Sequence, residues 1–265
     1  ERHKLVMARL KSSCKDWFIR KGADAMNHFL QYCIFPRCVF SPADALYCAK
    51  FVQHTHSQGT PGFSTLLYYD KLLRDLSIHI FSCTERQAAN LGRFLNALLG
   101  VVGHWKQEEK IYMEECAKLP GFSVSLSKDN QRKATFEDYV KVVFKWYCKM
   151  LKSLNSCLES AEYMEVRNGL HVLTRISEVF PKMKKVCDHL ERRVAKIKVD
   201  PRRDLQMLAS NYHTVLQKIK PMLQTQEEFC MGFLVRGLIG PDTAGAKPLD
   251  KADKAKEKDK DKDKD

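Results

Sequence analysis

The sequence predicts an all-α protein: an irregular stack of antiparallel helix pairs, either a HEAT- or armadillo-like solenoid or a bundle, followed by a disordered C-terminal tail. Hydrophobic residues recur at spacings of three and four along most of the first 240 residues, which is the period of an α-helix. Proline residues fall between these periodic segments, where helices end. Strand signals are nearly absent, since the best candidate, residues 123–127, is too short to build a sheet.

Capping residues mark where several helices begin. Ser41 precedes Pro42, and proline suits a first helical turn because its missing N–H has no partner there. Thr84 with Gln87 matches a capping box, and Thr135 offers a similar cap followed by acidic residues. We expect helices at about residues 3–21, 24–34, 42–57, 64–81, 85–117 with a possible break near 104, 136–158, 161–180, 182–198 and 203–218.

The composition changes after the last predicted helix. We assign residues 1–240 to an all-helical scaffold domain and residues 241–265 to a disordered charged tail. The tail contains Lys, Asp, Glu and Ala but, after residue 250, no large apolar side chain, so it cannot bury enough surface to offset the entropy of ordering. The chain starts within an amphipathic pattern and without Met, which we interpret as the mark of a fragment.

Ten cysteines are scattered through the chain, and none forms a C-x-x-C pair. Most lie among apolar residues, so we expect reduced core thiols, as in the cytosol or nucleus. Trp17, Trp105 and Trp146 lie on or beside apolar faces and are expected to pack in the core. One group of residues has some resemblance to a zinc site but has poor ligand spacing, so we favour core thiols beside a polar loop; it consists of Cys33, Cys38, Cys48, His54 and His56.

The sequence lacks phosphate loops, dinucleotide fingerprints, H-E-x-x-H and G-x-S-x-G motifs. We therefore predict no enzymatic activity, no catalytic residues, no cofactor, no metal and no small-molecule substrate. A Cys/His catalytic pair remains an alternative, although no cysteine has a recognisable catalytic surrounding. No apolar run is long enough to cross a bilayer, so a membrane partner is not expected either.

The formal net charge of +13 is concentrated on the helices. Residues 247–265 contain eight lysines and seven acidic residues, so the tail is nearly neutral, whereas residues 182–203 contain nine basic and three acidic residues. On a helical wheel Lys185, His189, Arg192 and Lys196 lie opposite the apolar residues of segment 182–198, and the segment's other basic residues flank or follow them. This stripe is predicted to bind RNA or an acidic partner, with a solvated face as the alternative. Its residues are Lys182, Lys184, Lys185, His189, Arg192, Arg193, Lys196, Lys198, Arg202 and Arg203.

Several segments resemble the C-terminal region of the THO complex subunit 2 family. The longest are Phe29–Cys38, which reads FLQYCIFPRC, Ala43–Val52, which reads ADALYCAKFV, and Thr60–Leu67, which reads TPGFSTLL. The resemblance covers about residues 1–220. Shorter matching segments are Gly92-Arg93-Phe94-Leu95, Lys145-Trp146, Arg167-Asn168 and Leu190-Glu191-Arg192-Arg193-Val194.

This resemblance implies a non-enzymatic scaffold in the nucleus. The family forms the large helical backbone of the THO complex, which couples transcription to messenger-RNA packaging and export and limits RNA–DNA hybrids. Its implied partners are the other THO subunits and a DEAD-box RNA helicase, which supplies the ATPase activity, as well as RNA or an RNA–DNA hybrid. The family's C-terminal extension is basic, whereas the tail here is balanced, so nucleic-acid contact would have to involve the helices. A purely protein-binding helical repeat remains the second interpretation.

Overall fold

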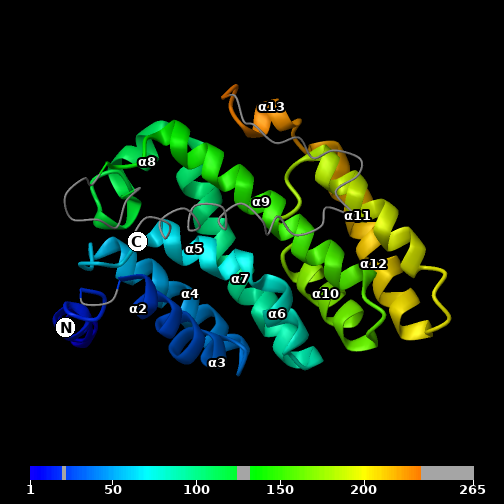
Figure 1. The fold of residues 1–265 in the computed structure, drawn as a ribbon, viewed down its shortest axis with the longest axis horizontal. Coiled ribbons are helices and arrows are strands. Elements are labelled where there is room, and N and C mark those ends of the chain that lie inside the picture. Colours follow the sequence, from blue (N-terminus) through cyan, green and yellow to red (C-terminus); the bar gives the residue numbers. More distant parts are fainter. Residues whose placement is uncertain (20–21, 124–131, 234–265) are drawn as a thin grey trace, which may run out of the picture.

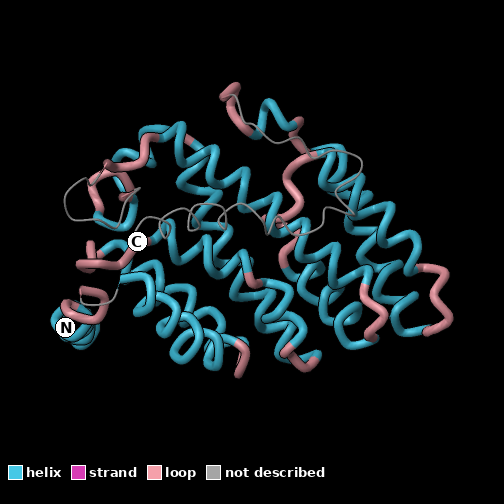
Figure 2. The backbone as a smooth tube through the Cα atoms, in the orientation of Figure 1, coloured by secondary structure: helices cyan, strands magenta, loops and turns pink. Residues whose placement is uncertain are grey.

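The computed structural model describes residues 1–19, 22–123 and 132–233, and in this part of the chain helices are joined by loops and turns (Figure 2). Within these ranges there is no β-strand, and two isolated bridges join Ser123 to Lys133 and Met183 to Gln224. The all-α prediction is confirmed, whereas the tail at 241–265 lies outside the described residues. The α-helices are α1 (Arg2–Cys14), α2 (Gly22–His28), α3 (Phe35–Cys38), α4 (Pro42–Ser57), α5 (Thr65–Arg74), α6 (Leu76–Phe81), α7 (Glu85–Gln107), α8 (Glu109–Glu115), α9 (Phe136–Glu159), α10 (Tyr163–Arg175), α11 (Lys184–Ile197), α12 (Arg203–Ile219) and α13 (Gln226–Phe229).

The helices pack in two layers, and the chain alternates between them. One layer contains α4, α7, α10 and α12, and the other contains α5 with α6, then α9 and α11. Figure 1 shows the stack running from α2, α3 and α4 at one end to α11 and α12 at the other. Because short connectors link a helix of one layer to the next helix in the other, successive helices form the antiparallel pairs that the sequence predicts.

The central helix, α9, shows why the periodic sequence gives this packing. Its apolar face is buried along its whole length, from Phe136 to Leu158. The Tyr139 hydroxyl donates a hydrogen bond to the carbonyl oxygen of Val102 at 3.0 Å, so a fully buried polar atom has its partner. Trp146 is 2% exposed and stacks on Tyr69 with ring centroids 5.4 Å apart.

The predicted caps form as expected. The Ser41 hydroxyl accepts a hydrogen bond from the backbone N–H of Asp44 at 3.1 Å, and Pro42 opens α4. Thr84 and Thr135 each form a complete capping box, with Gln87 and Asp138 respectively returning a bond to the cap's own N–H. Each cap supplies partners to backbone N–H groups that lack one within the helix, which stabilises a helix start by about 1 kcal/mol.

Several predicted helix boundaries are wrong. Segment 3–21 ends as a helix at Cys14, 161–180 ends at Arg175, and 24–34 contains a π-helical turn, Phe29–Ile34. Segment 64–81 is divided at Asp75, whose φ of −99° and ψ of 20° lie outside the helical region. Segment 85–117 is divided, as the sequence analysis allowed, but at Glu108 and not near 104; Glu108 is extended and redirects α8 so that Tyr112 stacks on Tyr139. Since neither Asp75 nor Glu108 is a proline or glycine, tertiary packing decides where these helices break.

Trp17 and Cys33 also depart from the prediction of a core position. Trp17 is 48% exposed, since α1 ends before it, and Cys33 is exposed on the outer side of the π-helical turn. The other tryptophans are buried, as are eight of the ten cysteines, while Cys148 is half-buried. Burial raises the pKa of the Cys48 thiol to about 11, which keeps it protonated and unreactive at neutral pH.

His56, one of the five residues that resembled a zinc site, instead joins three segments of the core through hydrogen bonds. Its Nε2 lies 3.2 Å from the carbonyl oxygen of Glu115 and its Nδ1 lies 2.9 Å from the Thr65 hydroxyl. A carbonyl oxygen only accepts, so Nε2 carries the proton and Nδ1 accepts from Thr65. In the described ranges, no three His, Cys, Asp or Glu side chains are placed to hold a metal ion. Those ranges also contain no helix long and apolar enough to cross a membrane.

Candidate cationic interface

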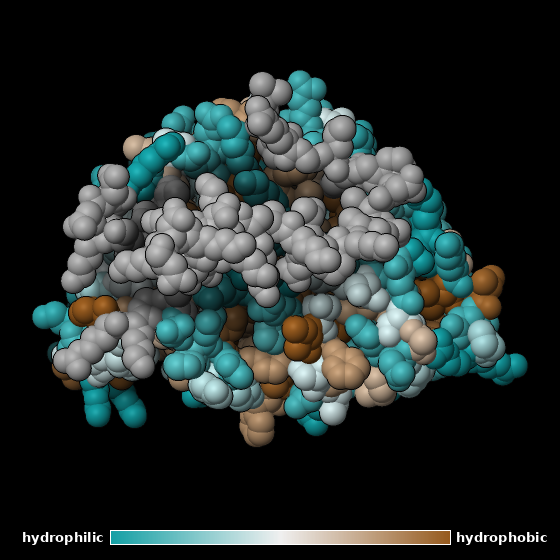
Figure 3. Space-filling view, viewed as in Figure 1, coloured by the Kyte–Doolittle hydropathy of each residue, from teal (hydrophilic) through white to brown (hydrophobic). Residues whose placement is uncertain are grey.

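The helix α11 is oriented as its sequence predicts. Its apolar residues are buried against α9 and α12, including Val186, Leu190 and Val194, each with no exposed surface. Their spacing of four residues places them on one side of the helix, so the basic residues between them must face solvent. Figure 3 shows a mainly hydrophilic surface over this end of the stack.

Most of the predicted stripe is solvent-accessible, although its members differ in their partners. His189, Arg193 and Arg202 are half-buried. The other seven residues of the stripe are exposed: Lys182, Lys184, Lys185, Arg192, Lys196, Lys198 and Arg203. Lys185, His189, Arg192 and Lys196 share the outer side of α11, whereas Lys184 lies on the side of Lys220 and Arg193 faces α9. Lys182 precedes the helix, Lys198 and Arg202 lie in the connector that follows it, and Arg203 begins α12.

Two members of the stripe are engaged in ion pairs inside the protein. Arg193 pairs with Glu159 at the end of α9. Arg202 binds Asp200 with two parallel hydrogen bonds, from Nε at 2.8 Å and from Nη2 at 2.8 Å, and its guanidinium lies over the Tyr163 ring. These bonds hold the pKa of Asp200 down at about 2. Arg193 and Arg202 therefore connect helices and have less freedom to bind a partner.

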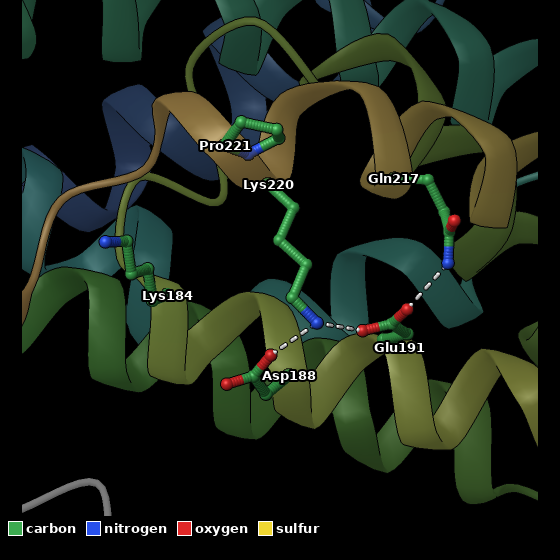
Figure 4. Close-up of a pocket in the computed structure, with 6 residues that line it drawn as sticks. All are labelled: Lys184, Asp188, Glu191, Gln217, Lys220 and Pro221. Atoms are coloured by element: carbon green, nitrogen blue, oxygen red, sulfur yellow. Dashed lines mark hydrogen bonds and ion pairs between the residues drawn. The ribbon is translucent and has the colours of Figure 1, made fainter.

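The acidic residues of α11 are neutralised from the end of α12 and the residue that follows it (Figure 4). Lys220 Nζ lies 2.9 Å from Asp188 Oδ1 and 2.6 Å from Glu191 Oε2, and the Gln217 amide donates to the other Glu191 oxygen at 2.9 Å. These groups, together with Lys184 and Pro221, line an open notch of about 380 Å³. Because Lys220 occupies both carboxylates, they do not neutralise the cations on the outer edge of α11.

Three cations of α11 remain available on its outer edge. Lys185 and Lys196 form no ion pair with any residue that the structure describes. Arg192 donates from Nε to the carbonyl oxygen of Asp188 at 3.2 Å, and its Nη2 lies 3.4 Å from His189 Nδ1, so its charge is not matched by a carboxylate. This edge can therefore attract an anion, and long exposed side chains can adjust to it.

A second row of cations lies on α9 and was missed by the sequence analysis. Lys141, Lys145, Lys149 and Lys152 are spaced by four, four and three residues, which places them on one face of the helix. Lys141 pairs with Glu137 at 2.5 Å and Lys149 pairs with Asp70, whereas Lys145 and Lys152 are exposed without a described ion-pair partner. The spacing of these lysines is the signal in the sequence that could have identified the row.

The two rows adjoin because α9 and α11 pack side by side. Glu159 lies two helical turns beyond Lys152, on the same face of α9, and it reaches Arg193 on α11. We call this surface the cationic face and define it by Lys145 and Lys152 of α9 with Lys185, Arg192 and Lys196 of α11. It is a positively charged surface on a rigid helical support, with no group arranged for catalysis among the residues described.

The fold and this surface define an all-helical protein with a cationic face. Comparison with known proteins specifies its family. Residues 1–216 match the Tho2 family, described as "Transcription factor/nuclear export subunit protein 2". The chain therefore belongs to the Tho2 family.

The relatives are much longer than this chain. It is 45% identical over 238 residues to THO complex subunit 2 of Arabidopsis thaliana, a match that covers 88% of this chain and 13% of the relative. The human protein of the same name is 41% identical over 235 residues, covering 84% of this chain and 15% of the relative. The Saccharomyces cerevisiae protein is 26% identical over 164 residues, covering 62% and 9%.

Proposed function

We propose that this chain is a non-enzymatic scaffold segment of the THO complex in the nucleus. Membership of the Tho2 family and the two-layer helical stack support this proposal. A stack of this kind offers extended surfaces to several partners at once. The expected partners are other THO subunits and the DEAD-box RNA helicase, which would contribute the ATPase activity to messenger-RNA packaging and export.

We further propose that the cationic face contacts RNA, or an RNA–DNA hybrid, through the phosphate backbone. The observation that carries this proposal is the set of exposed cations on α9 and α11 that form no ion pair with a described residue, while the two acids of α11 are occupied by Lys220. Lys185 and Lys196 are eleven residues apart, which corresponds to about 16 Å along the helix. Flexible side chains spread over that distance suit repeated phosphates, and they would read little base sequence.

The test is RNA binding measured over a range of salt concentrations. The triple variant Lys185→Glu, Arg192→Glu, Lys196→Glu is compared with wild type on single-stranded RNA. If all three contact phosphate, the slope of log affinity against log salt should fall in magnitude by about 2, since each contact contributes about 0.7. A matched control is Lys50→Glu, Arg86→Glu, Lys110→Glu, which changes the net charge equally at exposed sites on α4, α7 and α8.

The alternative is a purely protein-binding module. An unchanged affinity and slope in the α11 triple variant would reject RNA contact at this face, as would an equal loss in the control variant. Retained capture of other THO subunits by a chain that binds no RNA would favour the protein-binding module. Exposed cations could then serve an acidic partner or solubility.

A further inference from the structure

A glycine brings α7 and α10 into close contact. A Cβ atom added at Gly92 would lie 2.6 Å from Arg175 Cβ and 3.4 Å from Val172 Cα. Real Cβ atoms do not approach other carbons to 2.6 Å, so the crossing requires a residue without a side chain. As a result, Arg175 lies directly against α7, beside the residue that follows Gly92, which is Arg93.

Neither Arg93 nor Arg175 forms an ion pair with a carboxylate in the described part of the chain. Arg93 is half-buried, and its Nη1 donates to Asn90 Oδ1 at 3.1 Å. Asn90 is 1% exposed and its amide donates to the carbonyl oxygen of Val39 at 3.0 Å, so the guanidinium is held by a fixed group. Burial and the charge of Arg175 together lower the pKa of Arg93, which shows that the two cations act on each other.

The carboxylates near this crossing are bound elsewhere. Glu85 is shared by Arg167 and His171, each at 3.2 Å. Glu178 accepts a hydrogen bond from the Asn96 amide at 3.4 Å. Two like charges held together without a counter-ion are unfavourable, and an anion from outside the chain would relieve their repulsion.

The surroundings favour a protein partner over a nucleic acid. Glu178 follows Arg175 by three residues, and its charge is not matched by a cation among the described residues. It would repel a polyanion that runs across the crossing, whereas a peptide can present one carboxylate to the arginines. Asn90 also fixes Val39, and the next residue along the chain is Phe40, whose side chain is 78% exposed. Exposed aromatic residues and arginines are both enriched in protein–protein contact centres.

We propose that the α7–α10 crossing, through Arg93 and Arg175, binds an acidic peptide segment of a partner protein, and that Phe40, which follows the Val39 bonded to Asn90, offers a contact for an apolar residue of that peptide. This surface belongs to α7 and α10, whereas the cationic face belongs to α9 and α11. The two surfaces would allow one stack to hold RNA and an acidic partner at the same time. This proposal does not depend on RNA binding.

The test uses a fluorescein-labelled peptide with one aspartate and two leucines, and a control peptide with asparagine in place of the aspartate. Binding to the full chain is followed by fluorescence anisotropy. We expect the Arg93→Gln, Arg175→Gln variant to lose about tenfold in affinity for the aspartate peptide, since two charge-assisted contacts are removed. The control variant Lys50→Gln, Lys110→Gln, which loses the same charge at exposed sites, should bind as wild type does.

Three results would overturn the proposal. The first is a wild type that binds the aspartate peptide no more tightly than the asparagine peptide. The second is an equal loss in the control variant. The third is a loss of oligouridylate binding, instead of peptide binding, in the Arg93→Gln, Arg175→Gln variant. Because Arg93 is half-buried, the single variant Arg175→Gln, at an exposed position, gives a reading independent of folding and should lose part of the affinity.

Discussion

Two glycines of α7 should respond in opposite ways to the same substitution. Gly92→Ala inserts a Cβ atom 2.6 Å from Arg175 Cβ, which is attached to the backbone of α10 and cannot rotate away. Overpacking of this kind costs roughly 1–3 kcal/mol, while replacing glycine by alanine in a helix interior contributes about 1 kcal/mol. Overpacking should win, so Gly92→Ala should destabilise the fold by about 1 kcal/mol.

Gly100 supplies the matched control. It lies in the same helix, is exposed, and has no neighbouring atom within 4 Å of a built Cβ. Only the helix-propensity gain applies there, so Gly100→Ala should stabilise by about 1 kcal/mol. The two variants should therefore differ by about 2 kcal/mol in urea unfolding followed by circular dichroism, with similar m-values. Equal stability of the two variants would refute the argument that the α7–α10 crossing requires glycine.

Three further predictions concern buried groups and thiols. Asn168→Leu should lower the free energy of unfolding by about 2–4 kcal/mol, because the Asn168 amide donates to the carbonyl oxygens of Ile80 and Cys83 and both would lose this donor. In urea unfolding, a decrease in the midpoint of less than about a few tenths molar would contradict this. Burial lowers the pKa of His56 from 6.5 to about 4, so the unfolded chain binds more protons than the folded chain between these pH values. The free energy of unfolding therefore decreases as the pH is lowered through this range. Wild type should thus lose about 2 kcal/mol more than His56→Gln between pH 7 and pH 5 in urea unfolding, and parallel profiles would exclude His56 as the cause. A thiol reagent at neutral pH should label Cys33 rapidly and the buried cysteines only on unfolding, which mass spectrometry of the labelled peptides can check.

The features that the sequence predicted correctly are local ones. The caps at Ser41, Thr84 and Thr135 depend on hydrogen bonds between residues three positions apart. The burial of one side of α9 and of α11 follows from the 3.6-residue period. Those signals are contained within a single helix, so they can be read without knowing what packs against it.

The candidate surfaces were only partly predictable. The basic edge of α11 followed from its composition, and its exposure is confirmed, while contact with RNA or an acidic partner there stays a prediction. The spacing of the α9 lysines can be read from the sequence, but only the packing of α9 against α11 shows that they lie beside a second row of cations. Arg93 and Arg175 are 82 positions apart, and nothing in the sequence indicates that Gly92 brings them together.

By itself, the sequence determined the all-α class, the starts of several helices and the placement of the positive charge outside the tail. Tertiary structure alone decided the break at Asp75 and moved the break expected near residue 104 to Glu108. It also decided which charges are neutralised, as when Lys220 of the segment after α12 binds Asp188 and Glu191 of α11. The physical reason is range: a helix period and a cap depend on adjacent turns, whereas the free charge of a surface depends on partners that only packing brings together.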